Sequence, residues 1–244
     1  MSHDLDALPR SGAVSRALAK WFFRAARVTD VAKLSPRFRL FTLRGEQLRA
    51  LAWEPGQKVQ IVVGPGMTWR TYTPITWDPD AGQTRLLGFR HGEGPASQWL
   101  AKLAAGTDCA VFGPRRSLDV AASPTDIVLF GDETSFALAA ALRATFSSRP
   151  ILAVFEVSDR TEAQTVLGQI GLAEAIIVER STSESHLEAL AGQVSAFGAE
   201  RAGQIVLTGR APAIQFLSRS LKAAGLGPRI RAKAYWAPGK VGLD

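Results

Sequence analysis

The pattern of hydrophobic and polar positions changes once along the chain, near residue 120. From about residue 26 to residue 117, apolar residues come in short runs that are rich in β-branched and aromatic side chains and separated by Gly, Pro or Asp. Such runs predict β-strands, and their close spacing favours a small antiparallel barrel or a sandwich. The expected strands are RVTDVAKLS, RFRLFTLRG, KVQIVVG, RTYTPITWD, TRLLGFRHG and TDCAVFGP.

One segment of this half predicts a loop and the start of a helix. HGEGPASQW, residues 91–99, leads into a helix that we expect to begin near Ser97, whose hydroxyl can cap it. Gly92 and Gly94 allow the backbone to come close to a ligand, and a helix N-terminus presents unpaired N–H groups that suit a phosphate. An ordinary strand-to-helix connection explains the same residues, so the pattern alone names no ligand.

After Pro124, near-continuous apolar runs alternate with helical stretches. Strands that alternate with helices predict βαβ units and a parallel sheet covered on both faces. Ligands of such sheets bind at the carboxyl ends of the strands, which selects GDETS (131–135) and TGRAP (208–212). The glycine fingerprint G-x-G-x-x-G is absent. The expected strands are DIVLFGD, PILAVFEVS, EAIIVER and GQIVLTG, and the expected helices include TSFALAAALRATF, ESHLEALAGQVSAFG and APAIQFLSRSLKAAG.

The predicted organisation is therefore a β domain followed by an α/β domain. Residues 1–25 form an N-terminal extension whose stretch SRALAKWFFRAARV fits a short basic amphipathic helix. Residues 26–122 form the antiparallel β-barrel, and residues 123–244 form the doubly wound parallel α/β sheet with a C-terminal tail. A chain of 244 residues is long enough for both cores.

Composition limits the chemistry that the chain can perform by itself. Its single cysteine, Cys109, excludes an intrachain disulfide and a four-cysteine iron–sulfur or zinc site. The three histidines are scattered without metal-ligand spacing. Redox chemistry would thus require an organic cofactor. No apolar run approaches the ~18 residues of a membrane span, and the N-terminus lacks a secretory signal, so a cytoplasmic protein is expected.

The positive charge is concentrated in the first half. Residues 1–122 carry 17 Lys and Arg against 10 Asp and Glu, whereas residues 123–244 carry 12 of each kind, in a chain of net charge +7. The basic residues are dispersed and form no nucleic-acid-binding motif, which disfavours nucleic acid as the partner. An anionic small molecule is the better candidate.

Four motifs, in this order, resemble those of siderophore-interacting proteins, which are FAD-dependent ferric-siderophore reductases of the ferredoxin-reductase group. RTYT (70–73) resembles the flavin motif Arg-x-Tyr-Ser/Thr of the group, and HGEGPASQW (91–99) resembles the Gly-Pro-Ala-Ser-x-Trp segment of the family. FGDETSFAL (130–138) resembles its Gly-Asp-Glu-Thr turn, and AYWAPGK (234–240) its terminal Tyr-Trp segment. The matches span nearly the whole chain from residue 26.

The resemblance implies an FAD site in the barrel. Arg70 would hold the pyrophosphate, Tyr72 would stack on the isoalloxazine ring, and Thr73 would hydrogen-bond the flavin N5. Periodicity alone makes Tyr72 and Thr73 ordinary strand residues. Trp99 is equally well explained as a core residue, and His91 is expected to contact the cofactor. The cofactor-binding residues implied are Arg70, Thr71, Tyr72, Thr73, His91, Gly92, Gly94, Pro95, Ala96, Ser97, Trp99, Asp132, Thr134, Tyr235 and Trp236.

The resemblance also implies a site for NADPH or NADH at the carboxyl edge of the parallel sheet. Arg210 is a candidate partner for an adenosine phosphate, although relatives usually carry Gly-Glu where this chain has Gly209-Arg210. Two further departures are Pro74-Ile75 after RTYT, where the family often has an arginine, and Ala237-Pro238 after the terminal Tyr-Trp. The implied nucleotide-binding residues are Gly131, Asp132, Glu133, Thr134, Thr208, Gly209 and Arg210.

The implied reaction passes electrons from NAD(P)H through FAD to the Fe³⁺ of a ferric siderophore and releases Fe²⁺ for iron assimilation. Ferredoxin is another conceivable donor. Two alternatives remain open: a general NAD(P)H:flavin or ferredoxin/flavodoxin reductase, and a non-catalytic protein that binds ferric siderophore or flavin. The basic residues expected to attract an anionic chelate are Lys58, Arg115, Arg116 and Lys240.

Overall fold

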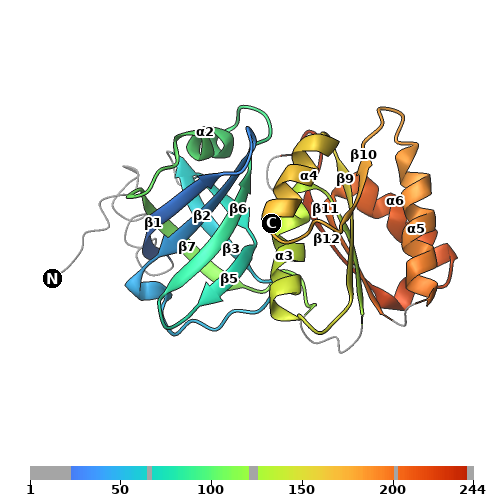
Figure 1. The fold of residues 1–244 in the computed structure, drawn as a ribbon, viewed down its shortest axis with the longest axis horizontal. Coiled ribbons are helices and arrows are strands. Elements are labelled where there is room, and N and C mark those ends of the chain that lie inside the picture. The colour runs from blue at the N-terminus through green and yellow to red at the C-terminus, as the bar shows by residue number, and fades with distance from the viewer. Residues whose placement is uncertain (1–22, 65–67, 121–125, 201–202, 241–244) are drawn as a thin grey trace. The chain divides into compact units, whose positions relative to one another are not determined.

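The computed structural model describes residues 23–64, 68–120, 126–200 and 203–240. The chain divides into two compact units, Met1–Arg116 and Ser117–Asp244, each with its own sheet (Figure 1). The predicted boundary at 122/123 lies outside the described residues. So does most of the predicted N-terminal helix; its last residues belong to a strand that begins at Arg24.

The first unit is an antiparallel sheet with the strand order β4-β3-β7-β1-β2-β6-β5. Its two outermost strands, β4 and β5, follow one another in sequence with Thr73 as the single residue between them. Because the two edges are joined through one residue, the sheet has to curl until they meet, which gives the barrel of Figure 1. The strands are β1 (Arg24–Lys33), β2 (Phe38–Arg44), β3 (Lys58–Gly64), β4 (Thr68–Tyr72), β5 (Pro74–Asp78), β6 (Gln83–Phe89) and β7 (Asp108–Arg115).

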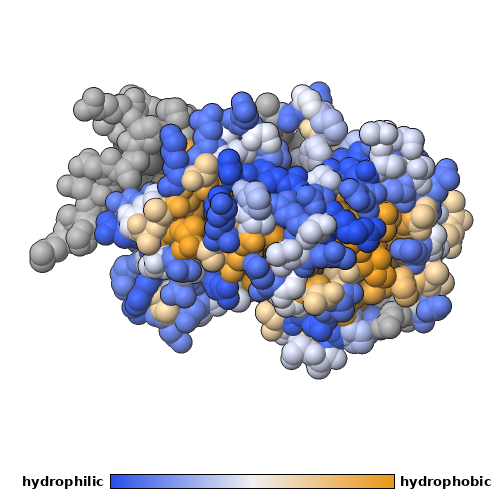
Figure 2. Space-filling view, turned by 45° about the horizontal axis from the view of Figure 1, so that its top comes forward, coloured by the Kyte–Doolittle hydropathy of each residue, from blue (hydrophilic) through white to orange (hydrophobic). Residues whose placement is uncertain are grey.

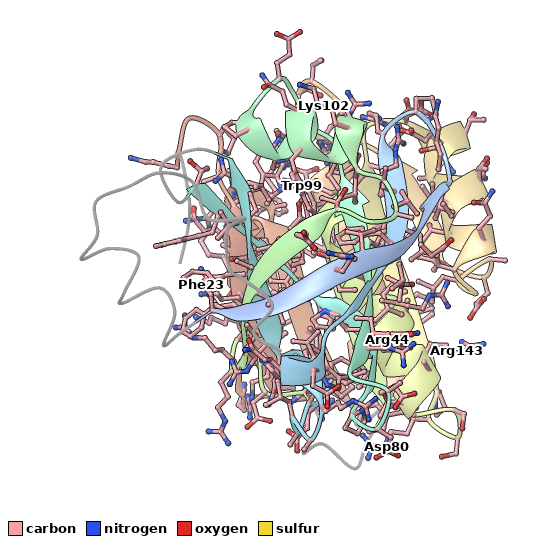
Figure 3. All side chains as sticks on the ribbon, turned by 90° about the vertical axis from the view of Figure 1, so that its left-hand side faces the viewer. Phe23, Arg44, Asp80, Trp99, Lys102 and Arg143 are labelled. Atoms are coloured by element: carbon pink, nitrogen blue, oxygen red, sulfur yellow. The ribbon has the colours of Figure 1, made fainter. Side chains whose placement is uncertain are left out.

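The helix α2 (Pro95–Lys102) closes the barrel core. Leu100 lies against Gly88 of β6 so closely that a Cβ built on Gly88 would be 2.4 Å from the Leu100 Cδ2 atom. Trp99 points from α2 toward the strands, whereas Lys102 points away from them (Figure 3). The Trp99 ring meets the Phe41 ring edge-on at 5.7 Å between centroids. The core therefore fixes the position of α2 and of the loop that precedes it.

The second unit is a parallel sheet with the strand order β10-β9-β8-β11-β12. Helices α3 and α4 cover one face and α5 and α6 cover the other (Figure 1). The elements are β8 (Ile127–Gly131), η3 (Glu133–Ser135), α3 (Phe136–Thr145), β9 (Ile151–Val157), α4 (Arg160–Gln169), β10 (Ile176–Glu179), α5 (His186–Glu200), β11 (Gln204–Arg210), α6 (Ala211–Ala223), η4 (Gly227–Arg229) and β12 (Ile230–Trp236).

The fold class predicted from the sequence is confirmed, with two local differences. RTYTPITWD, predicted as one strand, forms β4 and β5 at opposite edges of the sheet. The sequence prediction also missed α4 and β12. RTEAQTVLGQ buries only Ala163, Val166 and Leu167, and β12 is an edge strand with no fully buried residue, so neither has a strong apolar pattern.

The surface mixes apolar and polar side chains. Each unit shows apolar areas on the face drawn in Figure 2, and polar side chains interrupt them. The exposed large hydrophobic residue of the described part is Trp69, on β4. No helix among the described residues is long and apolar enough to cross a membrane.

We expect Gly88→Ala to destabilise the barrel unit by roughly 1–3 kcal/mol, because the added methyl group would overlap the Leu100 side chain and push α2 outward. Urea denaturation followed by tryptophan fluorescence measures the change. The control is Gly192→Ala in α5, where a Cβ meets nothing within 4 Å and helix propensity favours alanine. Equal stability of Gly88→Ala and the wild type would contradict this account of the packing.

Candidate functional site

Arg70 carries a guanidinium group that meets no carboxylate among the described residues. The alternation of β4 places Arg70 and Tyr72 on one side of the strand, with Thr71 on the other. The Arg70 Nη1 group donates to the carbonyl of its neighbour Trp69 at 2.8 Å. A permanently charged, forked donor without an acidic partner is suited to bind a phosphate group.

The loop before α2 offers further donors. Gly94 is the N-cap of α2 and Pro95 its first residue, so the backbone N–H groups of Ala96 and Ser97 have no acceptor within the helix. Gly92 has a φ of +63°, and a Cβ built on Gly92 or Gly94 would meet nothing within 4 Å. The backbone at these two glycines therefore borders open space, which would let a phosphate group come close to the loop.

Ser97 differs from its prediction. The helix begins two residues earlier than expected, and Gly94, not Ser97, caps it. The Ser97 side chain is buried, and its Oγ donates to the carbonyl of His91 at 3.0 Å. Its hydroxyl therefore holds the loop closed, which leaves the Ser97 backbone N–H, not its hydroxyl, as the donor for a ligand.

The aromatic residues of the motifs lie in two places. Tyr72 packs into the barrel core, where its ring lies 5.9 Å from the Phe41 ring and 6.4 Å from the Trp99 ring. Burial raises the pKa of the Tyr72 hydroxyl, so it stays protonated. His91 is exposed, with its ring 6.0 Å from the Phe89 ring. Trp99 is therefore a core residue in this structure, and contacts of Tyr72, Thr73 and His91 with a cofactor stay predictions.

In the second unit, Asp132 joins two motifs that are far apart in sequence. Its carboxylate follows β8 and accepts hydrogen bonds from the Thr134 N–H at 2.9 Å, from the Thr134 hydroxyl, and from the indole Nε1 of Trp236 at 2.7 Å. Burial raises the pKa of Asp132 to about 6, although these hydrogen bonds oppose the shift. The GDET turn and the terminal Tyr235-Trp236 segment thus form one cluster.

Glu133 makes its contacts inside the unit, and its predicted place at a nucleotide site stays a prediction. Its Oε1 atom accepts hydrogen bonds from the N–H and the hydroxyl of Ser158, at 2.6 and 2.7 Å. Its Oε2 atom lies 2.6 Å from the Arg180 Nη2 atom. The side chain ties the turn after β8 to the ends of β9 and β10.

Arg210 and Thr208 also form hydrogen bonds inside the unit, and their predicted roles in nucleotide binding stay predictions. Arg210 is 5% exposed and donates to Glu156 and Glu184, so it presents no free guanidinium to a phosphate. The Thr208 hydroxyl is fully buried and donates to the Ser135 Oγ at 2.8 Å. Gly209 has a φ of +101°, and a Cβ there would lie 2.6 Å from the Asp132 carboxyl carbon, so this position requires glycine.

Glu156 is the centre of this network, and the sequence analysis missed it. It is fully buried in β9 and accepts from Arg210 Nε at 2.8 Å and from His186 Nε2 at 2.8 Å. His186 Nδ1 accepts the Ser181 N–H at 3.2 Å, which places the ring proton on Nε2. A lone carboxylate within the apolar run PILAVFEVS was the available signal, because a buried charge needs a partner.

The basic residues predicted to attract an anionic chelate fall into two groups. Lys58 is only 7% exposed, so it is not an accessible surface charge. Arg115, Arg116 and Lys240 are exposed. Arg115 lies over the Phe112 ring at 4.8 Å and donates to the Gln60 side chain.

Two further observations concern metals and thiols. No group of His, Cys, Asp and Glu side chains in the described ranges could hold a metal ion. Cys109 is buried, and burial raises its pKa to about 12, so it is a protonated thiol at neutral pH.

Residues 25–119 match the family model of the oxidoreductase FAD-binding domain. The match contains Arg70, the loop 91–94 and the start of α2, which are the donors described above. The residues of the barrel unit therefore agree with the cofactor of the matched family, FAD, whose diphosphate requires such donors.

Solved structures with this fold cover nearly the whole chain. A siderophore utilization protein from T. fusca is 24% identical, with a TM-score of 0.70 over 91% of this chain and 95% of its own. The siderophore-interacting protein SipS from Aeromonas hydrophila is 19% identical, with a TM-score of 0.71 over 90% and 93%. The ferredoxin reductase of carbazole 1,9a-dioxygenase is 19% identical, with a TM-score of 0.71 over 88% and 69%. At these identities the likeness establishes the fold.

We expect Asp132 to make the stability of the α/β unit depend on pH. A carboxyl whose pKa rises from 3.8 to about 6 on folding favours the folded state below pH 4, and this contribution is lost as the pH rises through 6. Asp132→Asn removes the effect, so its stability relative to the wild type should improve by about 1–3 kcal/mol between pH 4 and pH 7. Urea denaturation at each pH measures the difference.

Asp119→Asn, an exposed aspartate of the same unit, is the control. It should keep the pH profile of the wild type. A stability difference between Asp132→Asn and the wild type that does not change with pH would rule out the raised pKa.

Proposed function

We propose that this chain, an FAD-binding oxidoreductase with the fold of siderophore-interacting proteins and ferredoxin reductases, passes electrons from a nicotinamide nucleotide through FAD to a ferric siderophore. The observation that carries the proposal is Arg70. This arginine belongs to the RTYT motif, lies on strand β4 and falls within the part of the chain that matches an FAD-binding family. It has no acidic partner among the described residues.

The barrel residues would bind and orient the cofactor. Arg70 and the N–H groups of Ala96 and Ser97 would hold the diphosphate, and Tyr72 and Thr73 would position the isoalloxazine ring. When bound, FAD supplies the ability to accept two electrons and release them one at a time. The protein then needs no acid, base or nucleophile of its own.

The α/β unit would bind the nucleotide at the carboxyl edge of its sheet. Asp132 and Thr134 follow β8, where ligands of open parallel sheets bind. Gly131 lets the chain turn tightly there, because a Cβ would lie 2.3 Å from the Ser135 Cβ. The edge would be stabilised from inside the unit by the hydrogen bonds of Glu133, Thr208 and Arg210. Tyr235 would lie next to the nucleotide site, beside Trp236.

A ferric siderophore as the acceptor is supported by two features. The motifs GPASxW and GDET, with the terminal Tyr-Trp, resemble those of siderophore-interacting proteins, and two solved structures with this fold carry siderophore-related names. The exposed cations Arg115, Arg116 and Lys240 suit an anionic chelate. A reductase for ferredoxin or flavodoxin is the second candidate, because a ferredoxin reductase has the same fold and because exposed cations would equally suit an acidic protein partner.

Arg70→Ala should weaken FAD binding by about 1.5–3 kcal/mol, or roughly 10- to 150-fold in Kd, because it removes a charge-assisted set of hydrogen bonds to phosphate. Fluorescence titration of the flavin-free protein with FAD and with FMN measures the affinities. The control is Arg85→Ala, an exposed strand arginine of the same unit. If the wild type takes up no FAD, or prefers FMN, the proposed function fails.

The rate constant kcat/KM for an anionic ferric chelate should fall as ionic strength rises, because salt screens the attraction over about 10 Å at 0.1 M. Replacing Arg115, Arg116 and Lys240 together by alanine should flatten this dependence and raise KM, with flavin reduction by NAD(P)H little changed. Stopped-flow spectroscopy separates the two half-reactions. An unaltered salt profile in the triple variant would mean that the acceptor is neutral or binds elsewhere.

A further inference from the structure

The carboxyl edge of the parallel sheet holds arginines that are already neutralised. Arg180 follows β10 and lies 2.6 Å from Glu133, and Arg210 ends β11 and lies 2.8 Å from Glu156. His186 also pairs with Glu156. The guanidinium groups of Arg180 and Arg210 are thus bonded to glutamates of the same chain and are not free to bind a nucleotide phosphate.

Glu184 separates Arg210 from solvent. Glu184 Oε1 accepts from Arg210 Nη1 at 2.8 Å, and Oε2 pairs with Nη2. The Glu184 side chain is 45% exposed, whereas that of Arg210 is 6% exposed. The carboxylate therefore lies on the solvent side of the guanidinium and presents negative charge where the arginine would otherwise be reached.

The backbone at Glu184 supports this placement. Its φ is +60°, an uncommon conformation for a residue other than glycine. Its N–H donates to the Ser181 carbonyl, and its carbonyl accepts the Leu187 N–H at the start of α5. The loop is thus held in a conformation that directs this one carboxylate at Arg210.

NADPH differs from NADH by a 2′-phosphate, which needs a cation to bind and is repelled by a carboxylate. We propose that Glu184 is a specificity-determining residue that excludes the 2′-phosphate and makes NADH the preferred electron donor. This inference rests on the proposed function, because it assumes that a nicotinamide nucleotide binds at this edge.

One exposed cation at the same edge argues for the opposite preference. Arg160 follows β9 and has no ion pair among the described residues, while its neighbour Asp159 caps α4. If Arg160 receives the 2′-phosphate, the protein prefers NADPH despite Glu184. The experiment distinguishes the two.

Isothermal titration calorimetry of the FAD-loaded protein with 5′-AMP and with 2′,5′-ADP tests the preference without turnover. The wild type should bind 2′,5′-ADP no more tightly than 5′-AMP. Glu184→Gln should tighten binding of 2′,5′-ADP about ten-fold, on the scale of one charge-assisted hydrogen bond, and leave 5′-AMP within about two-fold. In steady-state kinetics, KM for NADPH should fall while kcat for either nucleotide stays unchanged.

Glu188→Gln, an exposed glutamate in the first turn of α5, is the control for the loss of one negative charge and should behave as the wild type. A glutamine at position 184 can still cover Arg210, so Glu184→Ala, which removes the covering group, is the second variant. The inference is overturned if the wild type binds 2′,5′-ADP more tightly than 5′-AMP, or if the Glu184 variants bind both fragments as the wild type does. Either result leaves the proposed function intact. If FAD binds but neither fragment does, and neither nucleotide reduces the flavin, the nicotinamide donor of the proposed function fails, and the inference with it.

Discussion

The α/β unit depends on one buried carboxylate. Glu156 is fully buried in a strand of apolar residues, and an uncompensated charge there would be very costly. Arg210 and His186 compensate it, which fixes the ends of β11 and the start of α5 relative to β9. Each partner then recruits a further group, since Arg210 also holds Glu184. Charge pairing, in addition to apolar packing, therefore positions the loops at the carboxyl edge.

The barrel unit shows the opposite arrangement. Arg70 has no acidic partner among the described residues, and the first N–H groups of α2 have no helical acceptor. Cations that are paired with carboxylates of the same chain stabilise the fold. Hydrogen-bond donors that have no partner in the chain are available to a ligand. The excess of positive charge in the first 122 residues agrees with this division of roles.

The sequence predicted the fold class because the pattern of its apolar residues changes along the chain. The first half has the pattern of short strands, and the second half has the pattern of strands that alternate with helices. It did not predict the contacts that decide the role of each site residue. Arg210 at a strand end was predicted to bind a phosphate, and nothing in the sequence indicated that Glu156 and Glu184, 54 and 26 residues away, bind its guanidinium group. Ser97 looks like a helix cap until its hydroxyl is found on the His91 carbonyl. Such pairings are set by tertiary structure, and a single sequence carries no direct signal for them.

Thr73 links the fold of the barrel to its candidate site. It is the one residue between β4 and β5, the strands at the two edges of the sheet. Tyr72, just before it, is anchored in the core against Phe41, and Pro74, just after it, has its φ fixed by its ring. The residues that close the barrel are therefore the ones that we propose position the flavin, so the constraint that folds the sheet would also set the place of the flavin ring. In this proposal the motif is held rigidly by the barrel, and the specificity for donor and acceptor would come from the loops and charges around it.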